Sequence, residues 1–167
     1  MLAVDESSII LYSTGWLRSL DLSDGSVLWE RGISQGNLDG ITPSGDCLMS
    51  IGGLGDNQSL VLLDQHGSDL WSLDLENVRF GMNDTIIFND GSIIVSYQWG
   101  ISQLNSDGTI RWTIDLEDAG LTSQSSFNQG VDVWHLAPTS DGGLVAGATH
   151  IISSEEQNTI FKFSLPS

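Results

Sequence analysis

The residues best suited to chemistry in this chain are its acidic ones, which outnumber the basic residues by 22 to 5 and give a formal net charge of −17. Two carboxylates can act as general acid and base, or bind a divalent cation, when a fold holds them at a fixed distance. Many of these acids are aspartates beside Gly or Ser, where an Asp side chain caps a tight turn. The pattern therefore favours turn and surface roles and selects no catalytic pair.

The three histidines offer imidazole groups for metal binding or proton transfer. His66 lies in a predicted turn, His150 ends a predicted strand, and His135 stands between Trp134 and Leu136. No two of them have the spacing of a zinc site, and the Asp-rich turns lack the alternating oxygen ligands and final Glu of an EF-hand. The sequence predicts no metal site and no cofactor. For His135 two hypotheses stay open, a hydrogen-bonded structural residue or a contact in a ligand pocket.

Nucleophiles are equally sparse. Cys47 is the single cysteine, and its place in the apolar run CLMSIGG predicts a buried thiol that forms no disulfide. The chain contains neither a phosphate-binding glycine loop nor the GxSxG motif of a nucleophilic serine. These patterns predict a protein that is not an enzyme.

Tryptophan shows the most regular spacing in the sequence. Trp29, Trp71 and Trp112 are 42 and 41 residues apart, and each follows by four residues a Gly that closes a polar turn. The three segments read SLDLSDGSVLW, LLDQHGSDLW and QLNSDGTIRW. A period of this length, built from strands and turns, is typical of the blades of a β-propeller.

The elements around these tryptophans are predicted to be strands. Short runs rich in Ile, Val, Leu and Trp alternate with Gly, Asp, Asn and Ser, and no helical period is present, so the chain is all-β. Five Asp-Gly pairs mark the breaks, and most are predicted to be hairpin tips because Gly adopts positive φ without strain. They are Asp24-Gly25, Asp39-Gly40, Asp90-Gly91, Asp107-Gly108 and Asp141-Gly142.

Alignment of the copies on their tryptophans predicts one domain over residues 1–167. It is a β-propeller-like array of about four four-stranded antiparallel blades, at residues 1–33, 34–76, 77–117 and 118–167. The last blade is predicted to be incomplete, because its outer strand and the accompanying Gly and Trp would follow Ser167. Such an open array would expose apolar blade faces, which predicts self-association or additional blades from a longer chain.

The repeat resembles that of the quinoprotein-type propeller family, whose signature joins a small residue, an Asp, a Thr-Gly pair and a Trp four residues after the Gly. Residues 19–29 carry Ser19, Asp21, Gly25 and Trp29 at this spacing, with Asp24 in place of the Thr. The later copies are one residue shorter and keep the following motif residues: Asp64, Gly67 and Trp71, then Asn105, Gly108 and Trp112. The resemblance implies that each Trp docks on a neighbouring blade and that each turn ties blade to blade.

The enzymes of that family use pyrroloquinoline quinone and are implied to need roughly twice as many blades, a cysteine pair and calcium. One cysteine excludes the pair, whereas the non-enzymatic members, such as the propeller lipoprotein of outer-membrane assembly, fit equally well. The sequence therefore predicts a non-catalytic binding or scaffold module. Two alternatives stay open, a fragment of a larger propeller enzyme with its active site elsewhere and a purely structural repeat spacer.

Candidate ligand contacts are Trp16, Trp99 and His135. Trp16 and Trp99 each begin the third strand of their unit, where an exposed ring could stack on a sugar or grip a peptide; core packing is the alternative. The predicted partner is a protein or a glycan, because the negative charge repels nucleic acid and anionic membranes. No segment is apolar enough for membrane insertion, and no signal peptide begins the chain. The segment APTSDGGLVAGAT resembles a secreted prokaryotic repeat, which implies an extracellular or cell-surface location.

Overall fold

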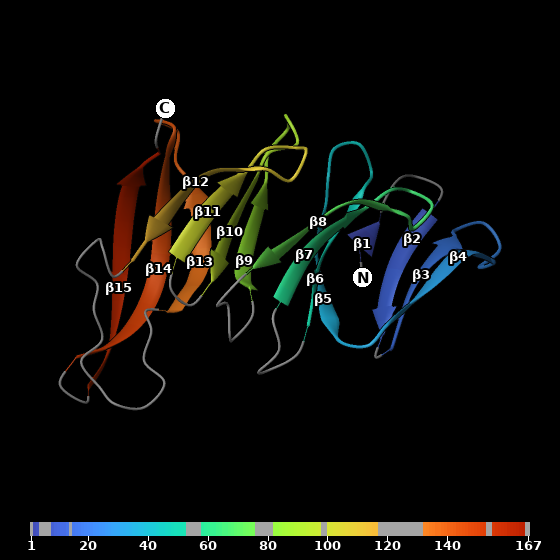
Figure 1. The fold of residues 1–167 in the computed structure, drawn as a ribbon, viewed down its shortest axis with the longest axis horizontal. Coiled ribbons are helices and arrows are strands. Elements are labelled where there is room, and N and C mark those ends of the chain that lie inside the picture. Colours follow the sequence, from blue (N-terminus) through green and yellow to red (C-terminus); the bar gives the residue numbers. More distant parts are fainter. Residues whose placement is uncertain are drawn as a thin grey trace.

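The computed structural model describes residues 2–3, 8–13, 15–52, 58–75, 82–97, 100–116, 132–152 and 155–165. This part of the chain contains fifteen strands and no helix, and the strands form four separate antiparallel sheets (Figure 1). No helix capable of crossing a membrane occurs among the described residues. The predicted all-β class is therefore confirmed.

Each sheet is a meander of strands that follow one another in the chain, and we call the sheets blades 1 to 4. Blade 1 contains β1 (Leu2–Ala3), β2 (Ser8–Ser13), β3 (Gly15–Asp21) and β4 (Val27–Ile33). Blade 2 contains β5 (Gly36–Ile41), β6 (Cys47–Ile51), β7 (Gln58–Leu63) and β8 (Asp69–Leu75). Blade 3 contains β9 (Met82–Ile87), β10 (Ile93–Tyr97), β11 (Gly100–Leu104) and β12 (Ile110–Asp115). Blade 4 contains β13 (Asp132–Pro138), β14 (Gly143–Ile152) and β15 (Glu155–Ser164), so the incomplete last blade is also found.

Four of the five Asp-Gly pairs lie at hairpin tips. Their glycines, Gly25, Gly91, Gly108 and Gly142, have φ between 74° and 82°, a region that side chains rarely enter. This confirms the prediction for most of the pairs; the exception is Asp39-Gly40, which lies inside β5 at a register shift between Leu38 and Gly40. A Cβ on Gly40 would lie 2.5 Å from Cδ1 of Ile87 in blade 3. This Gly therefore permits close packing of two blades rather than a turn.

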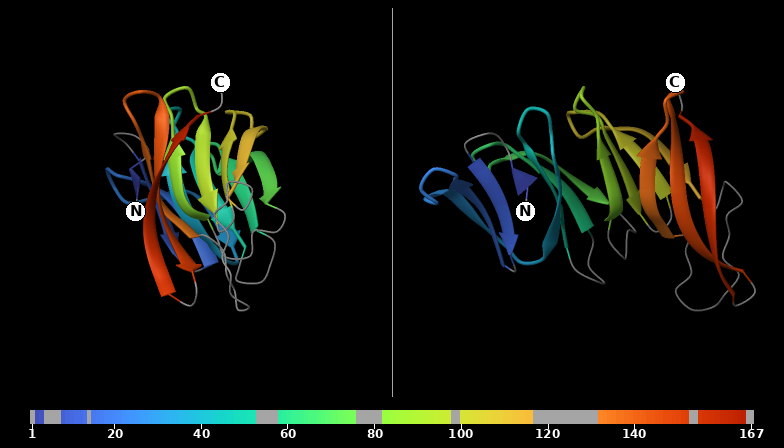
Figure 2. Two further views of the ribbon diagram at one scale, coloured as in Figure 1. Left: turned by 90° about the vertical axis from the view of Figure 1, so that its left-hand side faces the viewer. Right: turned by 180° about the vertical axis from the view of Figure 1, so that it is seen from behind.

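The core is divided into three clusters, one between each pair of consecutive blades. Successive residues of an inner strand point to opposite faces, so Cys47 and Met49 pack toward blade 1 while Leu48, on the same strand, packs toward blade 3. All three side chains are 0% exposed. The blades stack in an open row with blade 1 and blade 4 at its two ends (Figures 1 and 2). The sheets therefore do not close into a ring.

Candidate functional site

The repeated tryptophans join consecutive blades through one geometry. The indole Nε1 of Trp29 donates to the carbonyl oxygen of Gln65 at 2.6 Å, and Trp71 donates to that of Ser106 at 3.0 Å. Each ring lies over the turn glycine of the next blade, since a Cβ on Gly67 would meet Trp29 at 2.8 Å and one on Gly108 would meet Trp71 at 2.6 Å. Only glycine allows this approach of ring to backbone.

Trp112 occupies the same place in blade 3 but differs in the surroundings of its indole N–H. Its ring packs against the cluster between blades 3 and 4, and its Nε1 is buried without a hydrogen-bond partner among the described residues. We call the contact of each repeated Trp with the next blade a tryptophan joint. In the joints of Trp29 and Trp71, the carbonyl oxygen that accepts from the indole Nε1 belongs to the turn between the third and fourth strands of the next blade. Blade 4 has only three described strands.

This difference predicts unequal effects of removing the indole N–H. Trp71→Phe deletes a hydrogen bond and is expected to lower the free energy of unfolding by about 1 kcal/mol beyond the change in ring size. Trp112→Phe deletes a buried donor that has no described acceptor, so its loss is expected to be smaller by about that amount. Urea unfolding of the two variants and the wild type measures the difference, and equal losses would contradict it.

The acidic and amide residues of the turns satisfy backbone groups of their own turns. Asp21 accepts hydrogen bonds from the backbone N and Oγ of Ser23 at 2.7 and 2.6 Å. Asp64 accepts from the backbone amides of His66 and Ser68, both at 2.8 Å, and the Ser68 amide is the main reason that its pKa lies below the usual value. Asn105 donates to Thr109 Oγ1 at 2.9 Å in the equivalent turn. Within the described ranges no cluster of three or more metal-binding side chains occurs.

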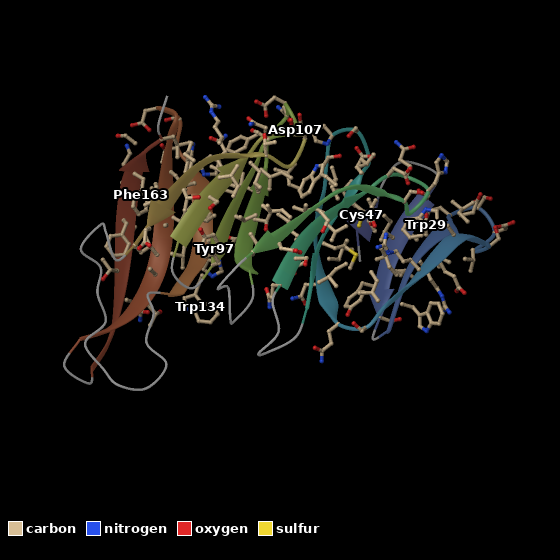
Figure 3. All side chains as sticks on the ribbon, viewed as in Figure 1. Trp29, Cys47, Tyr97, Asp107, Trp134 and Phe163 are labelled. Atoms are coloured by element: carbon tan, nitrogen blue, oxygen red, sulfur yellow. The ribbon has the colours of Figure 1, made fainter. Side chains whose placement is uncertain are left out.

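Cys47 is buried as predicted, and its chemistry is correspondingly inert. The side chain is 0% exposed in the cluster between blades 1 and 2 (Figure 3). Burial, and then the nearby charge of Asp39, raise the pKa of the thiol to about 12. Because the reactive species is the thiolate, this thiol cannot serve as a nucleophile at neutral pH.

The described residues bring an imidazole and a carboxylate together at the junction of β9 and β13. Asp84 of blade 3 accepts hydrogen bonds from the backbone amides of Thr85 at 2.8 Å and Leu136 at 2.7 Å, the second of which crosses to blade 4. Nδ1 of His135 lies 3.9 Å from Oδ2 of Asp84. The carboxylate is thus fixed by two amides and faces an imidazole. Trp134 precedes His135 in β13.

A β-bulge in β13 exposes the aromatic and imidazole side chains together. The register with β14 shifts between Val133 and His135, which leaves Trp134 as the extra residue. Strict alternation predicts that Val133 and His135 share one face; this is wrong, because Val133 is 0% exposed whereas the side chain of His135 is 89% exposed. Trp134 is 50% exposed, and its ring extends below the strands in Figure 3. We call Asp84, Trp134 and His135 the inner-strand site.

The other residues singled out from the sequence lie elsewhere. Trp16 is 44% exposed on the face of blade 1 that points away from blade 2, and the Arg18 guanidinium lies 5.7 Å from its ring centre. Trp99 lies outside the described residues, and so does the side chain of His150. His66 is exposed in its turn. Blades 1 and 4 stand at opposite ends of the row, so Trp16 and His135 do not form one site (Figure 1).

Sequence reasoning missed the inner-strand site because its members are distant in the chain. Asp84 and His135 meet through pairing of two blades, and the bulge that turns Trp134 outward has no signature in the residues around it. The one available signal was the adjacent Trp and His in a strand otherwise bounded by apolar residues. Of the three side chains, His135 alone was named as a candidate ligand contact from the sequence.

No protein-family model and no curated protein matches this sequence. Among solved structures the chain resembles a protein of unknown function from Bacteroides caccae, with a TM-score of 0.55 and 12% identity over 94% of this chain and 58% of that one. The chain has a propeller-like fold. The WD40 domain of Sif2 gives a TM-score of 0.41 at 10% identity, covering 99% of this chain and 56% of that domain. A eukaryotic initiation factor gives 0.39 at 7%, covering 98% and 64%.

The propeller-like chain spans less than two thirds of each of these three structures. At such low identity the similarity concerns the arrangement of the blades and not their ligands. The resemblance to the quinoprotein-type repeat is therefore supported for the fold and not for that family in particular. A binding or scaffold role agrees with this fold, and the identity of the ligand depends on the surface residues of the chain itself.

Proposed function

We propose that this chain is a non-catalytic binding module that recognises a protein segment bearing Lys or Arg side chains at the inner-strand site. The observation that carries the proposal is the exposed ring of Trp134 next in the chain to His135, whose imidazole lies 3.9 Å from the Asp84 carboxylate. An indole face attracts a cation, and a carboxylate within reach pairs with it. His135 adds a donor or acceptor at the same place.

The charge of the chain supports a basic ligand. With a net charge of −17 the surface potential is negative, and it attracts cationic segments and accelerates their association. The turn aspartates keep this charge at neutral pH, because hydrogen bonds with neighbouring Ser or Thr residues lower the pKa of Asp24, Asp90 and Asp107. The negative surface potential would raise the rate at which a cationic ligand reaches the protein, and the Trp134 ring would contact the bound ligand.

The site is also preorganised. Two backbone amides hold the carboxylate of Asp84, and the buried hydroxyl of Ser96 donates to the carbonyl oxygen of Val133 at 3.2 Å, which fixes β13 against blade 3. Groups held in this way lose little conformational entropy when a ligand binds. Because Asp84 and β13 are already held in place, ligand binding at this site needs no further ordering of the strand.

A neutral glycan is the second candidate, and the same ring favours it. Sugar rings stack their C–H faces on an exposed indole while carboxylate and imidazole groups bond the hydroxyls. The two candidates differ in salt dependence, because only a charged ligand is screened when the ionic strength rises.

We extend the proposal to an extracellular or cell-surface location, which rests on the resemblance of residues 137–149 to a secreted repeat.

Trp134→Ala is expected to weaken binding of a Lys- and Arg-rich peptide at least tenfold, about 1.4 kcal/mol, as the loss of a central aromatic contact does. Fluorescence or calorimetric titration at 0.1 M and 1 M NaCl measures it, with an Asp-rich peptide and a neutral oligosaccharide array alongside. Ile110→Ala, which truncates another half-exposed apolar residue, should leave binding unchanged. Salt-independent oligosaccharide binding lost in Trp134→Ala would favour the glycan, and unchanged binding would reject the site.

A further inference from the structure

The imidazole of His135 and the carboxylate of Asp84 face each other across the contact between blades 3 and 4. Nδ1 of His135 lies 3.9 Å from Oδ2 of Asp84, which is near enough for an ion pair and beyond hydrogen-bond distance. The side chain of His135 is 89% exposed, whereas that of Asp84 is 32% exposed. The imidazole can therefore rotate and exchange a proton with solvent while the carboxylate stays in place.

The carboxylate of Asp84 is held by bonds that do not involve His135. The backbone amide of Thr85 donates to Oδ1 at 2.8 Å, and that of Leu136 donates to Oδ2 at 2.7 Å. A carboxylate oxygen has two lone pairs, so Oδ2 can accept one more bond beside that of Leu136. Two cations compete for this position, a protonated His135 and the ammonium or guanidinium group of a ligand.

Asp84 is the charged group that faces His135 among the described side chains of the strands packed on β13, which are β9, β10 and β14. The remaining titratable side chains described on β10 and on β15, the next strand of blade 4, have hydrogen-bond partners of their own. They are Tyr97, which bonds Ser102, and Lys162, which bonds Asp141. The side chains of Asp132, His150, Glu155 and Glu156 lie outside the described residues.

We propose that His135 makes the binding of a basic ligand at the inner-strand site depend on pH, so that the ligand is released when the imidazole gains a proton. This inference rests on the proposed function. A neutral imidazole leaves the Asp84 carboxylate available to a Lys or Arg side chain of the ligand. An imidazolium turns toward Oδ2 of Asp84 and occupies that position, and its charge repels a cation held on the Trp134 ring. Imidazole groups change charge between about pH 5 and 8, whereas Lys and Arg side chains stay charged throughout this range.

Proton linkage gives the direction and the size of the effect. A ligand cation beside Asp84 opposes protonation of His135, so binding weakens as the pH falls and releases part of a proton at intermediate pH. Two unit charges about 4 Å apart in water interact with an energy that corresponds to about fivefold in an equilibrium constant. The dissociation constant is therefore expected to be about fivefold higher at pH 5.5 than at pH 8.

Calorimetric titration of the 167-residue chain with a peptide of Lys, Arg and Gly, blocked at both ends, tests the proposal at pH 5.5, 6.5 and 8 in 0.1 M NaCl. The wild type should bind about fivefold more weakly at pH 5.5 than at pH 8. At pH 6.5, titrations in two buffers of different ionisation enthalpy should show release of a fraction of a proton. His135→Gln keeps a hydrogen-bonding side chain without a titratable group and should show neither effect.

Two control variants separate His135 from other groups that titrate in this range. His66→Gln removes an exposed imidazole from a turn of blade 2. Asp39→Asn removes the carboxyl whose pKa is raised to about 6 by burial. Both variants are expected to keep the fivefold difference of the wild type.

The outcomes distinguish this inference from the function on which it rests. Equal affinities at pH 5.5 and 8, tighter binding at pH 5.5, or an undiminished pH dependence in His135→Gln would overturn the inference while the proposed binding of basic segments stands. Absence of peptide binding at every pH would reject the proposed function and this inference with it.

Discussion

Trp71→Ala is expected to lower the free energy of unfolding by about 3–4 kcal/mol, the range for truncating a large aromatic residue in a packed position. The ring covers Gly108 of blade 3, its Nε1 bonds the carbonyl oxygen of Ser106, and it packs on the cluster between blades 2 and 3. The substitution removes all three contacts at once. Since mesophilic domains have a stability of about 5–15 kcal/mol, this loss is a large fraction of the total.

The matched control is Trp134→Ala, which removes the same side chain from an exposed position and is expected to change stability by less than about 0.5 kcal/mol. Gly108→Ala is expected to lower the free energy of unfolding nearly as much as Trp71→Ala does. The φ of Gly108 is +82°, and the new Cβ would lie 2.6 Å from the Trp71 indole. Urea or thermal unfolding measures all three. If Trp71→Ala and Trp134→Ala lose equal stability, the tryptophan joint is not what holds the blades together.

The tryptophan joints show what the sequence could predict. A period of 42 and 41 residues with a Gly four residues before each Trp identifies a repeated unit, and four of the five Asp-Gly pairs lie at hairpin tips. Local chemistry decides these features, since a Gly of positive φ and a capping acid act within one turn. The all-β class and the incomplete fourth blade follow from the same local signals.

The bulges in the inner strands β5 and β13 show which features the sequence could not predict. Asp39-Gly40 has the same two letters as the hairpin tips but sits in β5, where the Ile87 side chain of the next blade packs against the space that a Cβ would occupy. In β13 a bulge at Trp134 reverses the face of His135. Both outcomes depend on contacts with a strand some fifty residues away in the chain. No window of local sequence contains that partner.

Trp112 and Ile160 repeat residue types of the earlier blades without repeating their contacts. Trp112 repeats the joint residue of blades 1 and 2 yet has no described acceptor for its Nε1, and Ile160 repeats an aliphatic residue that is buried in the third strands of blades 1 to 3, yet it is 79% exposed. Each side chain matches its repeat in type and differs in surroundings.

Asp39→Asn is expected to stabilise the protein by about 1–3 kcal/mol at pH 7.5 and to have little effect near pH 4. Burial raises the pKa of Asp39 from 3.8 to about 6, although hydrogen bonds from the side chain and backbone of Ser50 favour the charged form. Its Oδ2 is buried with no hydrogen-bond partner among the described residues. A shift of this size corresponds to about 3 kcal/mol between the two protonation states, and the new amide N–H offsets part of the gain.

The sign follows from proton linkage. The folded state holds a proton on Asp39 more tightly than the unfolded state does, so the stability that this group contributes is complete below pH 3.8 and is lost as the pH rises through about 6. Unfolding of wild type and Asp39→Asn between pH 4 and 7.5 measures the widening gap. Asp141→Asn provides a contrasting control: bonds from Lys162 and Thr139 hold the pKa of that carboxyl well below its usual range, so the loss caused by this variant should stay constant between pH 4 and 7.5 and shrink only below about pH 3.8. A constant gap between wild type and Asp39→Asn across this range would show that Asp39 is ionised in the fold at little cost.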